Sequence, residues 1–113
     1  MVENRDLVWD KEALSHLKEI YDFLKKGDDL AHANEVKNSI IKTTQDLIKN
    51  PFIFEQDRFK FDNDSSFRAF ETFKYRIAYK ITEKQIRILR VCHTRENQLN
   101  ISKPKFFDSI NLI

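Results

Sequence analysis

Residues 75 to 96, YRIAYKITEKQIRILRVCHTRE, carry most of the side chains in this sequence that could do chemistry on a phosphate. Cationic side chains stabilise the charge that develops on a phosphoryl group in a transition state. An imidazole exchanges protons near neutral pH, so His93 is a candidate general acid or base. The simpler interpretation is a set of solvated charges on the open face of a sheet, with a histidine bonded to the backbone. The cations of the segment are Arg76, Lys80, Lys84, Arg87, Arg90 and Arg95.

Few other residues are candidates for catalysis or metal binding. His16, His32 and His93 are scattered along the chain, and Cys92 is the single cysteine. One cysteine can neither complete a structural zinc cluster nor form an internal disulfide. No segment resembles a cofactor-binding loop. We therefore expect no metal and no cofactor, and we interpret Cys92 as a small core residue of a protein from a reducing compartment.

Length, hydropathy and charge predict a small cytoplasmic protein. The 113 residues indicate a single domain, residues 1–113. No run has the apolar length of a signal peptide or of a membrane span, so we expect no contact with a membrane. The net charge is +2, with a balance of −4 up to Asp57 and +6 from Arg58 onward. So small a net charge does not imply a nucleic-acid partner, and its uneven distribution is the more informative feature.

Two helices are predicted in the first half. Asp10 stands where an N-cap belongs, and Gly27 is expected to end the first helix in a left-handed conformation. Asp28 or Asp29 can cap the second helix, which must stop before Pro51. Apolar residues at three- and four-residue spacing predict two buried stripes that pair as an antiparallel hairpin. These are Ala13, Leu14, Leu17, Ile20, Tyr21 and Leu24, then Ala33, Val36, Ile40, Thr43 or Thr44, and Leu47.

Alternating residues predict a sheet in the second half. The candidate strands are RFKF at 58–61, FRAFET at 67–72 and YRIAYKI at 75–81. In YRIAYKI, alternation turns Tyr75, Ile77, Tyr79 and Ile81 toward the helices and Arg76, Ala78 and Lys80 toward an open, cationic face. The run IRILRVCH at 86–93 is apolar at both parities, which predicts a central strand covered on both faces. This pattern leaves the directions of Arg87, Arg90 and His93 open.

The order of these elements predicts an α+β fold: a short N-terminal strand, an antiparallel helical hairpin, then a three-stranded antiparallel sheet packed on the helices. An apolar tail of about residues 102–113 follows, with Phe106, Phe107, Ile110, Leu112 and Ile113. Because these residues are too apolar to remain solvated, we expect the tail to dock on the sheet or on the hairpin.

The motifs together resemble the RelE/ParE superfamily of toxins from bacterial type II toxin-antitoxin modules. The resemblance lies in LVWDKEALSHLKEIYDFL, a second helix ending at a proline, and FRAFETFKYRIAYKITEKQIRILRVCHTRE, and it spans roughly Leu7 to Ile101. It implies the superfamily fold. It also implies a toxin that arrests growth and that a small antitoxin, encoded by an adjacent gene, neutralises by wrapping it with an otherwise disordered, amphipathic tail.

For RelE-like members, the resemblance implies a metal-independent endoribonuclease. Arg76 then matches the arginine over the scissile phosphate of an mRNA, Arg95 matches a second phosphate-contacting arginine, and His93 is the remaining proton carrier. Arg58 and Lys60 lie near further basic residues of these enzymes, although the register is loose and we interpret both as solvated surface positions. The position expected for the RelE tyrosine holds Ile101, and no tyrosine follows Tyr79.

For ParE-like members, the resemblance implies a toxin that poisons DNA gyrase and cuts no RNA. The helical hairpin and its Trp9 entry favour this interpretation, as does the missing tyrosine. The alternatives that stay open are a RelE-like nuclease acting on mRNA, in some cases only on the ribosome, and an inactive relative or nucleic-acid-binding domain.

Overall fold

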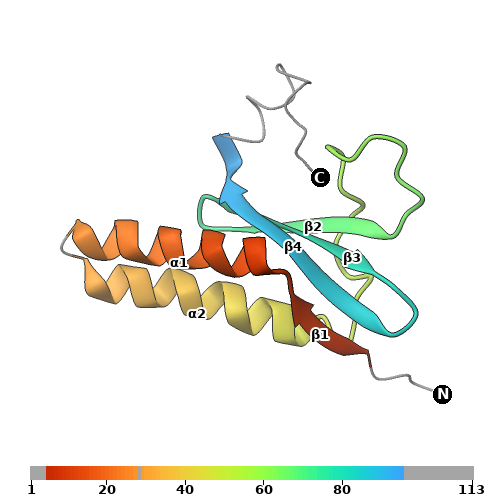
Figure 1. Ribbon diagram of the computed structural model, residues 1–113, viewed down its shortest axis with the longest axis horizontal. Helices are drawn as coiled ribbons and strands as arrows, with labels where there is room; N and C mark the ends of the chain where they lie inside the picture. Colours follow the sequence, from red (N-terminus) through yellow and green to blue (C-terminus); the bar gives the residue numbers. More distant parts are fainter. Residues whose placement is uncertain (1–4, 28, 96–113) are drawn as a thin grey trace.

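Two helices and a four-stranded sheet make up the fold (Figure 1). The structure is a computed structural model that describes residues 5–27 and 29–95, so the tail predicted at about 102–113 and Ile101 lie outside the described residues. The elements are β1 (Asp6–Trp9), α1 (Lys11–Lys26), α2 (Leu30–Asp46), β2 (Phe67–Thr72), β3 (Tyr75–Ile81) and β4 (Gln85–His93). The predicted strand, helical hairpin and three strands are confirmed in order and type.

The sheet is mixed, with the strand order β1-β4-β3-β2. β2, β3 and β4 pair antiparallel, as predicted, whereas β1 pairs parallel to β4, with Leu7 opposite Ile86. The sequence pattern indicated β1 but not its partner, because a crossover between parallel strands leaves no local turn signal. β4 is therefore central, as its apolar run predicted.

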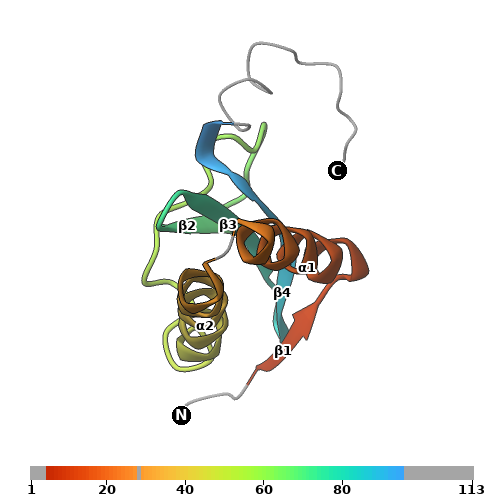
Figure 2. The same cartoon turned by 90° about the vertical axis from the view of Figure 1, so that its left-hand side faces the viewer.

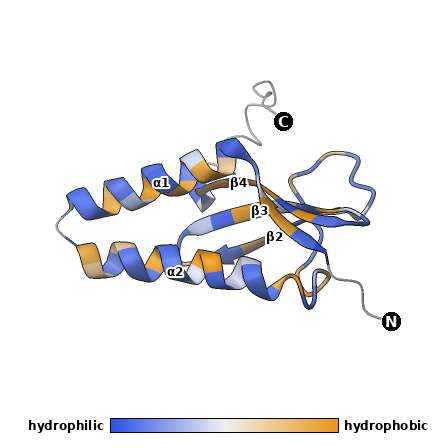
Figure 3. Cartoon of the chain, turned by 60° about the horizontal axis from the view of Figure 1, so that its bottom comes forward, coloured by the Kyte–Doolittle hydropathy of each residue, from blue (hydrophilic) through white to orange (hydrophobic). Residues whose placement is uncertain are grey.

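The helices form the second layer of the molecule. They lie side by side and are seen nearly end-on in Figure 2. α1 packs against β4 and α2 packs against β2. Hydrophobic residues recur along both helices, separated by hydrophilic ones (Figure 3). The largest fully buried side chains of this core include Ile40 and Leu47 from α2 and its end, and Ile77, Tyr79, Ile86 and Ile88 from the sheet.

The helix ends confirm most of the capping prediction. Asp10 is the N-cap residue of α1, but its side chain makes no capping hydrogen bond. Asp29 caps α2 by accepting a hydrogen bond from the backbone N–H of His32. Gly27 does end α1, yet its φ is −79°, so the left-handed conformation predicted for it is wrong. Of the predicted stripe on α1, Leu14 is 51% exposed, because α1 turns Ala13 and Leu17 into the core instead.

The connection from α2 to β2 wraps around the edge of the sheet. Pro51 contributes a carbonyl that accepts a hydrogen bond from the Tyr79 hydroxyl on the helix side, at 2.9 Å, and the Phe54 ring stacks on Phe70. Residues 55–57 then run beside β2, where Gln56 bridges to Arg68. The strand predicted at 58–61 is wrong. These residues form a turn on the other face of the sheet, because the side chain and carbonyl of Asp57 accept hydrogen bonds from the N–H groups of Phe59 and Lys60.

Candidate functional site

Arg76 is the most constrained of the predicted site residues. The strand register confirms that it lies on the face away from the helices, where it sits opposite Glu71 on β2 and Cys92 on β4. Although this face was expected to be open, Arg76 is only 6% exposed. Its guanidinium forms two ion pairs, Nη2 to Asp57 Oδ1 at 2.8 Å and Nη1 to Glu71 Oε2 at 3.0 Å. Two carboxylates therefore surround the charge that was expected to meet a phosphate.

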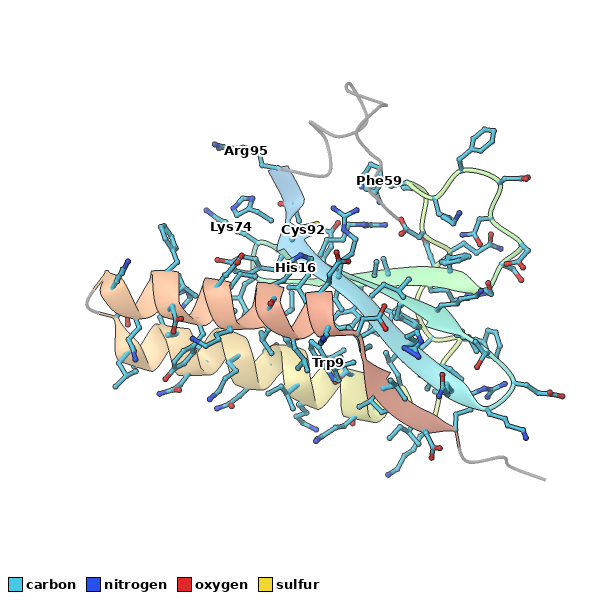
Figure 4. The ribbon with its side chains drawn as sticks, in the orientation of Figure 1. Trp9, His16, Phe59, Lys74, Cys92 and Arg95 are labelled. Atoms are coloured by element: carbon cyan, nitrogen blue, oxygen red, sulfur yellow. The ribbon has the colours of Figure 1, made fainter. Side chains whose placement is uncertain are left out.

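The turn at residues 58–61, which follows the segment 55–57 beside β2, holds Asp57 in place for this contact. The Asp57 backbone N–H donates to the Phe67 carbonyl at 2.8 Å, and its side chain also accepts from the Phe59 N–H at 3.0 Å. Asn63 closes the loop, since its side-chain amide donates to the carbonyls of Asp57 and Phe67. The Phe59 ring then covers Arg76, whose Cζ lies 4.5 Å from the ring centroid. Phe59 is labelled in Figure 4, in the loop beyond the sheet.

The other two cations predicted near the site belong to this same turn. Arg58 is exposed, with its Cζ 4.6 Å from the Phe59 centroid, and Lys60 is exposed, with its Nζ 4.7 Å from the Phe67 centroid. The loop thus brings Arg58 and Lys60 to the same face of the sheet as Arg76. Neither contacts a carboxylate at ion-pair distance within the described residues.

His93 lies on the opposite face of the sheet from Arg76. It pairs with Tyr75, the residue before Arg76, and neighbouring side chains on a strand point to opposite faces. The two rings meet edge to face with 5.7 Å between centroids. Nδ1 of His93 also accepts a hydrogen bond from the backbone N–H of Arg95 at 3.1 Å. The structure therefore does not bring His93 and Arg76 together.

Arg95 lies beyond the end of β4 and is exposed. Figure 4 shows Arg95 and Lys74 at the same end of the sheet, and the Thr94 N–H donates to the Lys74 carbonyl at 3.0 Å. Arg95 comes three positions after Cys92, the partner of Arg76 in the sheet. The three predicted catalytic residues thus occupy two faces and one end of the sheet.

A bulge in β4 explains its apolar residues at both parities. Ala78 pairs with Arg90 and Tyr79 pairs with Ile88, so Leu89 is an extra residue. Before the bulge, Ile86 and Ile88 face the helices and Arg87 faces away. After it, Val91 and His93 face the helices, whereas Arg90 and Cys92 face away. The apolar residues at both parities therefore reflect a change, at Leu89, in which alternate residues of β4 face the helices, and not a strand covered on both faces.

Cations remain on the open part of the face that carries Arg76. We use the term basic patch for Lys60, Lys80, Arg87 and Arg90, which come from the loop, β3 and β4. Lys80 lies directly opposite Arg87, and Arg87 Nη1 is 2.6 Å from Asp10 Oδ1. Hydrogen bonds from the side chain and backbone of Ser66 lower the pKa of Asp64, and the nearby charge of Lys80 adds a smaller effect in the same direction.

Several residues that shape this face carried no signal in the sequence. Asp57, Phe59 and Glu71 were ordinary loop and strand positions, and their role depends on contacts with Arg76 from other elements. His16 on α1, on the helix side of the sheet, is another residue whose role the sequence did not indicate. Its Nδ1 accepts the Val91 N–H at 3.2 Å, where α1 crosses β4 (Figure 4). Among the described residues, no three His, Cys, Asp or Glu side chains gather as metal ligands would.

Neither helix in the described part of the chain has the length and hydrophobicity needed to cross a membrane.

The strand, helical hairpin and three-stranded arrangement define a small α+β fold that is also found in a solved structure. The structure matches a solved structure described as the chromosomal ParDE TA system from P. aeruginosa, with a TM-score of 0.63 and 19% sequence identity over 79% of this chain and 95% of that chain. At this identity the likeness shows the fold. A search of curated proteins found no match.

The sequence profile of the family described as "ParE toxin of type II toxin-antitoxin system, parDE" matches residues 7–98. The chain therefore belongs to the ParE toxin family of the RelE/ParE superfamily, as the resemblance predicted. A parDE system pairs the toxin with a ParD antitoxin, so a ParD-type partner is implied for this chain.

Proposed function

We propose that this toxin arrests growth by binding DNA gyrase and that it breaks no bond itself. The observation that carries the proposal is the state of Arg76. An arginine stabilises a phosphorane when its donors are aimed at the phosphate and are not already saturated by anions. Here Asp57 and Glu71 hold both terminal nitrogens, and the Phe59 ring covers the guanidinium. A phosphate approaching Arg76 would meet the field of two carboxylates.

The placement of the proton carrier supports the same proposal. General acid-base catalysis requires the base within hydrogen-bond reach of the reacting group. His93 and Arg76 lie on opposite faces of the sheet, and the chain has no tyrosine after Tyr79. An RNA strand lying along either face would meet one of these residues and not the other. Binding without chemistry needs no such constellation.

Expression of the toxin in cells can distinguish the two mechanisms. Gyrase inhibition predicts growth arrest, with a reporter plasmid that loses negative supercoils within minutes and mRNA 5′ ends that match those of uninduced cells. Co-expression of the antitoxin should restore both growth and supercoiling. New mRNA 5′ ends inside coding regions, with plasmid supercoiling unchanged, would contradict the proposal.

A further inference from the structure

Both helices extend past the end of the sheet at which β4 ends (Figure 1, Figure 3). His16 on α1 accepts a hydrogen bond from Val91, and Phe23 follows His16 by seven residues, which is about two turns on the same side of the helix. Phe23 is thus about 10 Å further along α1, whereas β4 has only two residues after Val91, about 7 Å of strand. The sheet therefore leaves Phe23 uncovered, and this residue is 72% exposed.

A second exposed aromatic residue lies at the same end of the sheet. Phe73, in the turn between β2 and β3, is 49% exposed, and its ring meets that of His32 on α2 edge to face, with 5.5 Å between centroids. The φ of Phe73 is 55°, a left-handed conformation that is rare for a bulky residue. The fold thus holds an exposed ring at a strained position, and burial of that ring by another segment would stabilise the protein.

The pairing of the helices brings Phe23 to the level of Phe73. Lys37 of α2 lies over the ring of Tyr21 on α1, with its Nζ 4.8 Å from the centroid, so residues 21 and 37 are level in the antiparallel hairpin. Two residues further along α1, Phe23 is level with residue 35, less than one turn from His32 and the Phe73 ring. We use the term apolar end for Phe23, its half-buried neighbours on α1 and Phe73, that is, Ile20, Phe23, Leu24 and Phe73.

The chain leaves the described fold at this same end. The Thr94 N–H donates to the carbonyl of Lys74, in the turn between β2 and β3, and Arg95 follows. Residues 96–105 link Arg95 to Phe106, and a link of this length spans up to about 35 Å when extended. The 17 residues of α2 extend only about 25 Å, so the whole helical hairpin is within reach of Phe106.

We propose that residues 106–113 dock on the apolar end of the same chain. Five of these eight residues are apolar: Phe106, Phe107, Ile110, Leu112 and Ile113. A segment on so short a link has an effective concentration of about millimolar at the surface, which favours it over a free protein of similar composition. The matched family profile ends at residue 98, so this docking concerns a part of the chain outside that profile and does not depend on gyrase as the target.

The other exposed aromatic residues suit the tail less well. Phe52 lies near the opposite end of the sheet, because Arg5 donates to the Thr82 carbonyl and also lies over the Phe52 ring, 5.9 Å from its centroid. Arg68 lies over the same ring at 5.0 Å. Phe61 is in an exposed turn, between two charged residues of the chain. The apolar end, in contrast, combines several apolar side chains close to the point where the tail begins.

Thermal unfolding of full-length variants tests the proposal. Phe23→Ala improves the helix propensity of α1, so its thermal midpoint would not fall if Phe23 were simply solvated. With the tail docked on Phe23, we expect Phe23→Ala and Phe107→Ala each to lower the midpoint by about 5 °C. The two losses should not add in the double variant, because each substitution removes the same contact. Phe61→Ala is the matched control and should shift the midpoint by less than about 2 °C, with or without Phe107→Ala.

The amide NMR spectrum of the same proteins locates the contact. Phe107→Ala should shift the signals of residues 20–24 and 72–75 and leave those of residues 61–65 in place. An unchanged midpoint for Phe23→Ala, additive losses in the double variant, or shifts confined to another surface would overturn the proposal. A midpoint that rises with protein concentration would also overturn it, by assigning the tail to a second copy of the chain. Loss of antitoxin binding by Phe23→Ala without a change in the midpoint would likewise do so, by assigning the apolar end to the antitoxin.

Discussion

At the scale of single residues, Arg76 lies on the predicted face of the sheet, but it is buried where an open surface was predicted. Alternation along β3 places it away from the helices, as the sequence indicates. Its burial depends on Asp57, nineteen residues earlier, and on Phe59 from the same turn. No local pattern predicts that a loop will fold back over an open sheet face, so this contact could not be predicted from the sequence.

The clamp around Arg76 predicts a structural effect of its removal. Arg76→Ala leaves the Asp57 carboxylate, whose side chain is 13% exposed, without its cation, so the free energy of unfolding should fall by about 3 kcal/mol in urea denaturation. Arg76→Lys should recover only part of this loss, because an ammonium cannot serve both carboxylates in a fork. Lys84→Ala, in an exposed turn, is the control and should change stability by less than about 0.5 kcal/mol. A fully stable Arg76→Ala protein that had lost toxicity would instead assign Arg76 to the target contact.

Tyr79 predicts a loss of stability at alkaline pH. Burial raises its pKa to about 12, against an ordinary value of 10.0, because the folded protein disfavours the phenolate. Between these values the unfolded chain releases the proton and the folded one keeps it, so stability is full below pH 10 and falls as the pH rises toward 12, by up to about 1.4 kcal/mol per pH unit.

Tyr79→Phe is the control for this effect. It should be less stable than the wild type by about 1 kcal/mol at neutral pH, because the Pro51 carbonyl loses its donor, and it should lose less stability between pH 10 and 12. Denaturation of both proteins at a series of pH values makes the comparison. Parallel decreases in the two proteins would contradict the assignment to Tyr79.

At the scale of elements, periodicity predicted the helices well and turns less well. The helix ends follow from Asp10, Gly27 and Asp29, which act within a few residues of the chain. The turn at 58–61 was predicted as a strand because Phe59 and Phe61 alternate with cations. In the structure the Phe59 ring of this turn covers Arg76 instead. Pairing of β1 with β4 and the bulge at Leu89 depend on contacts distant in sequence.

The hydrogen bond between His16 and β4 is another contact between residues distant in sequence. β1 ends at Trp9, opposite Ile88 of β4. Beyond Ile88, the edge of β4 that faced β1 therefore has no neighbouring strand, within the described residues, to accept its backbone N–H groups. His16 from α1 supplies the acceptor for the Val91 N–H. We expect His16→Ala to lower the free energy of unfolding by about 1 to 2 kcal/mol and to speed hydrogen exchange at the Val91 amide.

Ser15→Ala is the neighbouring control, because Ser15 is exposed on the same helix and should tolerate the change. If His16→Ala matched this control in stability and in exchange at Val91, the hydrogen bond would have no role in joining α1 to the sheet.

At the scale of the whole molecule, charge separates along the chain and gathers on one face. The charge balance is −4 up to Asp57 and +6 from Arg58 onward. Part of the positive excess forms the basic patch, on the side of the sheet away from the helices. A small toxin that must bind an antitoxin and a target needs surfaces of distinct character. The face with Arg76 offers a cationic surface in which the central arginine is already occupied.

Supercoiling of relaxed plasmid by purified DNA gyrase tests most directly the proposal that this toxin inhibits by binding. Purified wild-type toxin should block supercoiling at a toxin concentration comparable to that of gyrase, and prior addition of the antitoxin should abolish the block. The same toxin preparation should leave a translated mRNA intact. Full supercoiling activity at a large excess of toxin, together with cleavage of that mRNA, would contradict inhibition of gyrase by binding.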